Sequence, residues 1–230
     1  MPFQTTNMIN YSYYHDECQL FIIYGLLGYG KTTFATKVLS EVLKGDWEEV
    51  KKYLVFKPED FIKLCMKLSK NHQREKAIVW DDAGLWLFAM KQNDPLITAV
   101  TQYLNVARTN WAAIIFTTPT PSWITYKIRN FPQHLRIKII KAQVDKGRCQ
   151  RLRIAKAYRT WIAPDFKKTG VRTIYTDYFD ATMPTDFYNW YKPIREDYAL
   201  TATTRMEEAL SKLKLEPKID PALTRDQYTI

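Results

Sequence analysis

One segment constrains the fold of this chain more than any other: FIIYGLLGYGKTTFATKVLSEVLKG, at residues 21–45. The apolar residues 19–24 are predicted to form a short buried strand. Residues 31–44 carry apolar side chains at helical spacing and are followed by Gly45, which predicts a helix and its stop signal. Six residues join the two elements and three of them are glycine, so the backbone between strand and helix is expected to form a tight loop.

The loop fits the phosphate-loop pattern GxxxxGK[ST] at residues 25–32. Glycines allow successive backbone N–H groups to point at phosphates near a helix N-terminus. Lys31 would add a cation for these phosphates, and the Thr32 hydroxyl would bind Mg²⁺. The predicted nucleotide-binding residues are Gly25, Leu26, Leu27, Gly28, Tyr29, Gly30, Lys31, Thr32 and Thr33. The alternative is a glycine-rich turn with no ligand.

A second motif, KAIVWDDAG, follows at residues 76–84. Residues 77–80 are predicted to form an apolar strand that ends in Asp81 and Asp82. Carboxylates at a strand end can hold Mg²⁺ and orient an attacking water; the alternative is that they cap the following turn. A strand at residues 52–56 and a helix at residues 58–70, with Pro58 in its first turn, are predicted between the two motifs.

The following residues continue this alternation of strands and helices. We predict a helix at about 95–108, a buried strand at 112–116 that ends in Thr117 and Thr118, a short helix at 124–130 and a strand at 135–140. Such alternation is typical of an α/β fold with a mostly parallel central sheet between two helical layers. The expected fold class is therefore a three-layer P-loop NTPase.

The order of these elements resembles the P-loop ATPases with an additional catalytic strand, the class of AAA+, RecA-like and packaging motors. The spacing GxxGxGKT is most similar to AAA+ proteins. The phrases WDDAGLWL and RTNWAAIIFTTPTPSWI resemble small ATPases carried by archaeal viruses and plasmids. The resemblance implies an Mg²⁺-dependent ATPase that uses ATP, acts on DNA and is encoded by a virus or plasmid.

The resemblance also implies roles for individual residues. Lys31 would act on the phosphates, Thr32 and Asp81 would bind Mg²⁺, and Thr117 would contact the γ-phosphate or the attacking water. Asp82 stands where the family usually has a glutamate that polarises this water. Because aspartate is one methylene shorter, hydrolysis is expected to be slow or to depend on assembly.

Self-association is expected, because AAA+ proteins place an arginine before the fifth strand in the nucleotide site of a neighbouring subunit. Arg129 occupies that position, and Arg108, at the end of the preceding helix, is the competing candidate. Either residue could instead be a solvated cation that is favourable at a helix C-terminus.

The net charge of the chain is concentrated in one segment. Residues 136–172 contain twelve Lys or Arg and two Asp, a net charge of +10 that equals the charge of the whole chain. Period-two alternation on both sides of the turn DKG predicts a basic antiparallel β-hairpin, where AAA+ proteins have a helical lid. The hairpin is expected to contact DNA phosphates through Arg136, Lys138, Lys146, Arg148, Arg151, Arg153 and Lys156.

Aromatic residues in and after the hairpin extend this prediction. Tyr158, Trp161 and Tyr175 are candidates for stacking on bases. The alternative is a charged face that meets only solvent.

These observations divide the chain into five parts: an N-terminal segment at 1–18, a P-loop ATPase core at 19–142, a basic β-extension at 143–183, a C-terminal helical segment at 184–214 and an extended tail at 215–230. Pro193 is expected to kink or divide the C-terminal helix. In the N-terminal segment, Tyr11, Tyr13, Tyr14 and His15 are close enough to the first strand to cover an adenine.

The composition is that of a folded protein: 46% of residues are apolar and 25% are charged. No stretch approaches the roughly 20 apolar residues that span a bilayer, and the first residues are too polar for a secretion signal. We therefore expect a cytoplasmic, intracellular protein without a membrane partner. The three cysteines and three histidines are scattered, which argues against a disulfide framework or a zinc cluster.

Two functions fit these features. In the first, ATP hydrolysis drives DNA handling, as in the replication, packaging or segregation of a mobile element. In the second, ATP binding switches oligomer state and DNA affinity with negligible turnover. Phosphate transfer to a small acceptor is a third hypothesis, and the missing arginine-rich lid argues against it.

Overall fold

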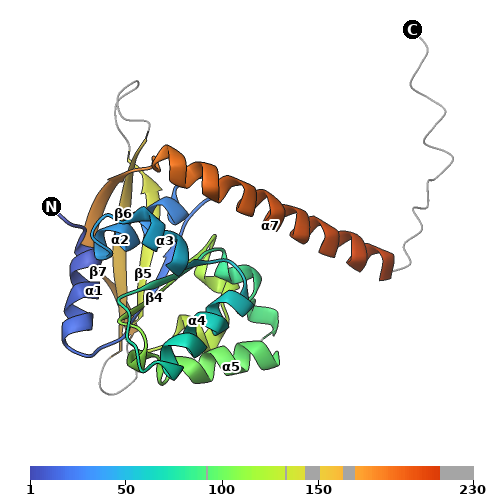
Figure 1. Cartoon of the computed structure of the whole chain (residues 1–230), viewed down its shortest axis with the longest axis horizontal. Helices are drawn as coiled ribbons and strands as arrows, with labels where there is room; N and C mark the ends of the chain where they lie inside the picture. The colour runs from blue at the N-terminus through green and yellow to red at the C-terminus, as the bar shows by residue number, and fades with distance from the viewer. Residues whose placement is uncertain (92, 133, 143–150, 163–168, 213–230) are drawn as a thin grey trace, which may run out of the picture. The chain divides into compact units, whose positions relative to one another are not determined.

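The computed structural model describes residues 1–91, 93–132, 134–142, 151–162 and 169–212. The chain divides into two compact units, Met1–Met183 and Pro184–Ile230, and each is described by itself. The first unit contains the sheet and all the residues predicted to bind nucleotide or DNA that the structure describes (Figure 1).

Between residues 19 and 141 the helices and strands of the first unit follow the predicted alternation, with one additional helix at 47–53; the helix at 4–14 and the strand at 169–180 were not predicted. In chain order they are α1 (Gln4–Tyr14), β1 (Gln19–Tyr24), α2 (Lys31–Val42), α3 (Trp47–Tyr53), β2 (Leu54–Val55), α4 (Pro58–Lys70), β3 (Ile78–Trp80), α5 (Pro95–Leu104), β4 (Ala113–Thr118), α6 (Tyr126–Arg129), β5 (His134–Lys141), β6 (Leu152–Ile162) and β7 (Thr169–Asp180). Short 3₁₀ turns at Ala83–Leu85, Ala89–Lys91, Ala107–Thr109 and Pro121–Trp123 complete them.

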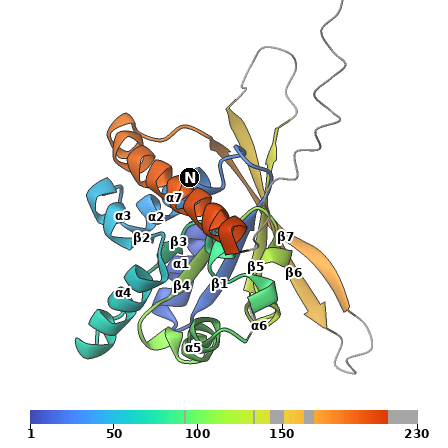
Figure 2. The ribbon, with the colours of Figure 1, turned by 90° about the vertical axis from the view of Figure 1, so that its right-hand side faces the viewer.

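The seven strands form one sheet in the order β2-β3-β4-β1-β5-β6-β7. The pairs β2/β3, β3/β4, β4/β1 and β1/β5 are parallel. The pairs β5/β6 and β6/β7 are antiparallel and extend the sheet beyond its parallel part (Figure 2). The predicted mixed α/β fold with a mostly parallel sheet is therefore confirmed.

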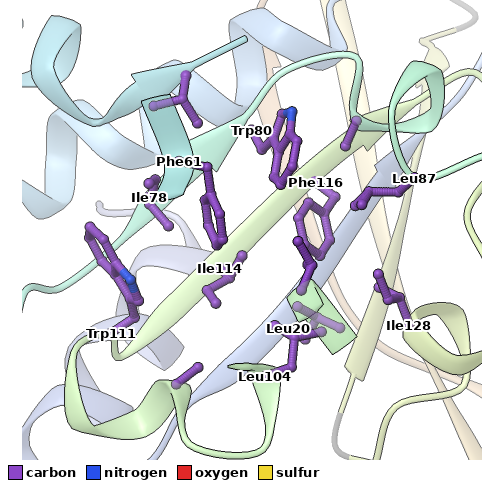
Figure 3. Close-up of a cluster of buried hydrophobic side chains, with 14 of the residues drawn as sticks. Leu20, Phe61, Ile78, Trp80, Leu87, Leu104, Trp111, Ile114, Phe116 and Ile128 are labelled. Atoms are coloured by element: carbon purple, nitrogen blue, oxygen red, sulfur yellow. The ribbon is translucent and has the colours of Figure 1, made fainter. Parts of the chain in front are cut away.

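Helices pack on both faces of the parallel part. On one face, Leu20 and Ile22 of β1 belong to a buried cluster with residues of α4, α5 and the neighbouring strands. Figure 3 shows its aromatic centre, where the Phe61 ring stacks on Trp80 at 4.9 Å between centroids and Phe116 lies beside Trp80. Helices α1 and α2 contact the sheet from its other face. Burial on both faces explains why β1 and β4 are apolar along their lengths.

The predicted strand at 52–56 is wrong at its start. Asp46 accepts hydrogen bonds from the N–H groups of Glu48 and Glu49 and begins a helix, α3. This cap reduces the strand to Leu54–Val55. The predicted helix at 95–108 ends at Leu104, and the one at 124–130 is reduced to Tyr126–Arg129.

The second unit contains one described helix, α7, at Thr185–Lys212. It continues through Pro193, so this residue does not divide the helix, and the alternative expectation of a kink stays a prediction. The tail predicted at 215–230 lies outside the described residues.

Candidate nucleotide-binding site

The glycine-rich loop lies at the point where the order of the parallel strands reverses. It follows β1, whose neighbours are β4 on one side and β5 on the other. In open α/β sheets, ligands bind at this position, beyond the carboxyl ends of the strands. The loop, Asp81 and Thr117 all lie at this edge, because β1, β3 and β4 are parallel and each ends there.

Two glycines of the loop could not be replaced without strain. A Cβ on Gly25 would lie 2.7 Å from the carbonyl oxygen of Ile139 in β5. Gly30 has φ +90° and ψ +30° and is the N-cap of α2, a left-handed conformation that favours glycine. The loop is therefore packed against β5 and enters α2 through a bend that a side chain would oppose.

The Lys31 side chain folds back along this loop. Its Nζ donates hydrogen bonds to the carbonyl oxygens of Gly25 at 3.0 Å and Leu26 at 3.2 Å, and only 7% of the residue is exposed. By contrast, Leu26 and Leu27 are 65% and 75% exposed at the tip of the loop. The Lys31 ammonium is thus held inside the ring of loop backbone where phosphates are predicted to bind.

Asp81 is the centre of a hydrogen-bonded cluster from three elements. The Thr32 hydroxyl of α2 donates to Asp81 Oδ1 at 2.9 Å, with Oδ2 at 3.1 Å. The Thr117 hydroxyl of β4 donates to Asp81 Oδ1 at 2.6 Å, and Asp81 is 1% exposed. Hydroxyl and carboxylate oxygens are ligands that Mg²⁺ prefers, so Thr32 and Asp81 fit the predicted metal site.

Asp82 has an unusual backbone. Its φ of 48° and ψ of 36° are left-handed, a conformation that is uncommon for residues other than glycine. Its N–H donates to Thr117 Oγ1 at 2.8 Å, so Thr117 connects both aspartates. The Thr118 hydroxyl instead donates to the carbonyl oxygen of Thr120. The structure therefore favours Thr117 over Thr118 at this site.

The two candidate arginines belong to the segments that precede β4 and β5. Arg108 lies before the amino end of β4. The six residues of this strand, Ala113–Thr118, span about 20 Å, so Arg108 is at the end of the strand opposite the glycine-rich loop. Arg129 donates to the carbonyl oxygen of Ser122 at 3.2 Å and lies over the Tyr126 ring. Their predicted role in a neighbouring subunit stays a prediction.

The prediction that the tyrosines near residue 13 cover an adenine is wrong. They end α1 at the amino edge of the sheet, opposite the loop, and Arg74 lies over the Tyr13 ring. The aromatic rings beside the first turn of α2 are those of Phe3 and Phe179, whose centroids lie 5.4 and 5.0 Å from Phe34. No local pattern in the sequence indicates these contacts, because they join residues far apart in the chain.

The predicted DNA-binding residues divide between the two faces of the antiparallel strands. Lys138 is exposed and Lys156 is half-buried on one face. Arg153 is 8% exposed on the other face, where Phe179 is its cross-strand neighbour. Arg151 is exposed just before β6, whereas Lys146 and Arg148 lie outside the described residues.

Arg136 is half-buried at the start of β5. Its guanidinium donates to His134 Nε2, to the carbonyl oxygen of Arg129 and to Asn130 Oδ1. Burial lowers its pKa from the ordinary arginine value, and Arg129 adds to this effect. Arg136 is therefore held by the protein rather than extended into solvent.

No family model matches the chain. An uncharacterised protein of Sulfolobus spindle-shape virus 1 is 31% identical over 115 residues, which are 47% of this chain and 46% of that protein. The chain thus spans less than half the length of this curated relative.

Two solved structures are similar at a lower level. The N-terminal domain of zonular occludens toxin from Neisseria meningitidis has a TM-score of 0.39 at 15% identity, covering 75% of this chain and 97% of that one. A KaiC-like protein from Pyrococcus horikoshii has a TM-score of 0.37 at 14% identity, covering 68% and 88%. Similarities of this size do not establish a shared fold. Among the described residues, no helix is both long and apolar enough to cross a membrane.

Proposed function

We propose that the protein binds ATP at the loop of residues 25–32 and hydrolyses it with Mg²⁺. The observation that carries this proposal is the convergence of Thr32 and Thr117 on the buried Asp81 carboxylate, beside a loop whose carbonyl oxygens accept hydrogen bonds from the Lys31 ammonium. Loop N–H groups and Lys31 would hold the phosphates. Thr32 and Asp81 would hold Mg²⁺, which when bound neutralises charge that develops on the phosphates.

Asp82 and Thr117 would position the attacking water. The hydrogen bond from the Asp82 N–H to Thr117 Oγ1 fixes the backbone from which the Asp82 carboxylate extends. The position of β4 between β1 and β3 is the arrangement expected of ATPases with an additional catalytic strand. The AAA+/RecA-like class is part of the proposal.

We further propose that nucleotide state is coupled to DNA handling in an oligomer, as in replication, packaging or segregation of a mobile element. This proposal is supported by contacts between the glycine-rich loop and β5, the strand that leads into the basic extension. Gly25 packs against the Ile139 carbonyl of β5, and Lys141 at the end of β5 lies 5.1 Å from the centre of the Tyr29 ring. DNA bound to these strands would therefore act on the nucleotide site through direct contacts.

A second candidate function is a nucleotide switch with negligible turnover. It is favoured by Asp82, whose carboxylate is one methylene shorter than that of glutamate. Replacing Asp82 by Glu separates the two candidate functions. If the short Asp82 side chain limits hydrolysis, the longer glutamate should raise the rate of phosphate release. If the protein is a switch, the rate should not change.

The primary test is steady-state phosphate release from Mg-ATP with and without DNA, with Lys31→Ala as the blank. Loss of release in Lys31→Ala and Asp81→Asn, and an increase with DNA in the wild type, are expected. Release equal to the blank under both conditions would exclude hydrolysis. If oligomer size then changes equally with ATP and a non-hydrolysable analogue, the switch replaces the ATPase.

A mixing experiment tests the arginine. Arg129→Ala subunits retain an intact loop, and Lys31→Ala subunits retain Arg129. If Arg129 acts on a neighbour, mixtures of the two inactive variants should recover part of the phosphate release. A mixture of Arg108→Ala with Lys31→Ala tests the competing residue in the same way.

A further inference from the structure

The antiparallel strands have one covered face and one face that displays lysine and tyrosine. Alternation along β5 and β6 places Ile137, Ile139, Ala155 and Ala157 on the covered face, where all four are buried. Helix α1 contacts β7 from this side, since Asp177 accepts hydrogen bonds from residues at the start of α1. The opposite face carries Tyr24, Arg136, Lys138, Lys156, Tyr158 and Tyr178, together with Ile140, Ile154 and Thr176, and we call it the tyrosine–lysine face.

Lys138 and Lys156 are direct cross-strand neighbours on this face. Like charges in this position lie about 5 Å apart at their Cβ atoms and destabilise a sheet. Among the described residues, neither lysine takes part in a salt bridge. Asp180 shares their face but pairs with Leu152, four residues from Lys156 along β6, or roughly 13 Å. The lysine pair is thus a site of positive charge that an anion would stabilise.

Two tyrosines flank the lysine pair on the same face. Tyr158 is two residues from Lys156 on β6, and Tyr178 is two residues from Thr176, the cross-strand neighbour of Lys156. Each step of two residues covers about 7 Å. Tyr178 is 62% exposed, and Tyr158 is half-buried beside Arg136. The order across the face is therefore tyrosine, lysine pair, tyrosine.

The other aromatic candidates do not share this face. Tyr175 lies opposite Ala157 on the covered side, and its hydroxyl hydrogen-bonds with Thr5 Oγ1 at 3.0 Å. Trp161 pairs with Gly170 on that side as well. Of the predicted stacking residues, Tyr158 thus lies on the same face as the lysine pair, and Tyr178 on that face was not among them.

We propose that the tyrosine–lysine face binds a single strand of nucleic acid, with phosphates on Lys138 and Lys156 and unpaired bases stacked on Tyr158 and Tyr178. Exposed aromatic rings contribute to binding when bases are free to leave their own stack, which a duplex prevents. A duplex would use the lysines alone. The proposal deepens the proposed function and rests on its nucleic-acid part, not on hydrolysis.

The test measures binding of a labelled oligodeoxythymidine longer than about 16 nucleotides by fluorescence anisotropy, beside an oligouridine and a duplex of equal length. The wild type should prefer the single strands, and the two single strands identify whether DNA or RNA is the ligand. Tyr178→Ala and Tyr158→Ala should each weaken single-strand binding at least about fivefold, the lower limit for one stacked base. Tyr178→Phe should retain binding, because the ring is kept.

The lysines are tested through salt dependence. Lys138→Gln/Lys156→Gln should lower the magnitude of the slope of log affinity against log salt by about 1.4, the value for two phosphate contacts on a single strand. The matched control, Lys63→Gln/Lys67→Gln, removes two exposed charges from α4 and should leave the slope unchanged. Tyr14→Ala, at a residue 76% exposed on α1, is the control for the tyrosines.

Three results would overturn the proposal: no binding by the wild type, equal binding of duplex and single strand with no effect of the tyrosine variants, or an equal loss in the α4 control. None of these results depends on whether the protein releases phosphate from ATP. The Lys31-dependent phosphate release tests the proposed ATPase separately. Conversely, single-strand binding that survives in Lys31→Ala would stand even if no hydrolysis is found.

Discussion

Asp81 shows how single residues of the candidate site depend on one another. Its carboxylate is 1% exposed and accepts hydrogen bonds from the hydroxyls of Thr32 and Thr117. A buried carboxylate is stable only when such partners are present. Each threonine therefore serves the fold and the proposed chemistry together, and a change at either affects both stability and nucleotide binding.

A pH dependence is expected at His134. Arg136 donates to its Nε2, so its Nδ1–H donates to the carbonyl oxygen of Phe131 and the ring is neutral. Burial, followed by Arg136 and Arg159, lowers the pKa of His134 below 6.5. As the pH falls below 6.5, the unfolded chain binds a proton before the folded one, so the free energy of unfolding should decrease.

This expectation is measured by an NMR titration of His134 and by urea unfolding between neutral and mildly acidic pH. His134→Gln keeps a side-chain acceptor for Arg136 but cannot titrate, so part of the loss of stability in acid should disappear. A pKa for His134 at or above 6.5 would contradict the prediction.

At the scale of elements, α1 is held by residues from distant parts of the chain. The Asp177 carboxylate of β7 accepts from the backbone N–H groups of Gln4 and Thr5 and from the Thr5 hydroxyl. The local N-cap, Phe3, makes no side-chain cap hydrogen bond. At the other end, Arg74 donates to the carbonyl oxygens of Ser12 and Tyr13. Both ends of α1 are thus satisfied by tertiary contacts.

Asp177→Asn should lower the free energy of unfolding by about 1–3 kcal/mol, because an amide replaces a charged acceptor and its own donors oppose the N–H groups. Chemical denaturation measures the change. Asp197→Asn is the matched control, since Asp197 is exposed on α7, and its effect should stay within about 0.5 kcal/mol. Equal effects of the two variants would show that the cap is not important.

At the scale of the whole molecule, nucleotide binding should stabilise the fold, because the loop contacts β5 and the Asp81 cluster joins α2, β3 and β4. Mg-ATP at 100 times its dissociation constant should add about 2.7 kcal/mol to the free energy of unfolding, which corresponds to roughly 5–10 °C in Tm for a chain of this size. Thermal denaturation with ATP and Mg²⁺ measures this shift.

The shift should be absent in Lys31→Ala and smaller without Mg²⁺. Lys37→Ala, in α2 but outside the loop pattern, is the control and should retain it. An equal shift in Lys31→Ala would place the nucleotide elsewhere in the protein.

The sequence by itself determined the elements whose causes are local. β1 begins and ends at the predicted residues, Gln19–Tyr24, because its apolar run is bounded by Gly25. Pro58, Glu59 and Asp60 begin α4, which also has its predicted bounds, Pro58–Lys70. The glycine spacing predicted a loop in which glycine is required, and Gly25 and Gly30 have conformations or contacts that require it.

Only the tertiary structure decided which of these residues meet. The caps of α1 could not be predicted, because Gln4 and Asp177 are 173 positions apart. The sequence predicted charge along the antiparallel strands, but cross-strand register decided that Lys138 and Lys156 face the same side as Tyr158 and Tyr178, and that Arg153 does not. Local patterns specify how a segment folds; pairing and packing over long distances in the chain decide which side chains share a surface.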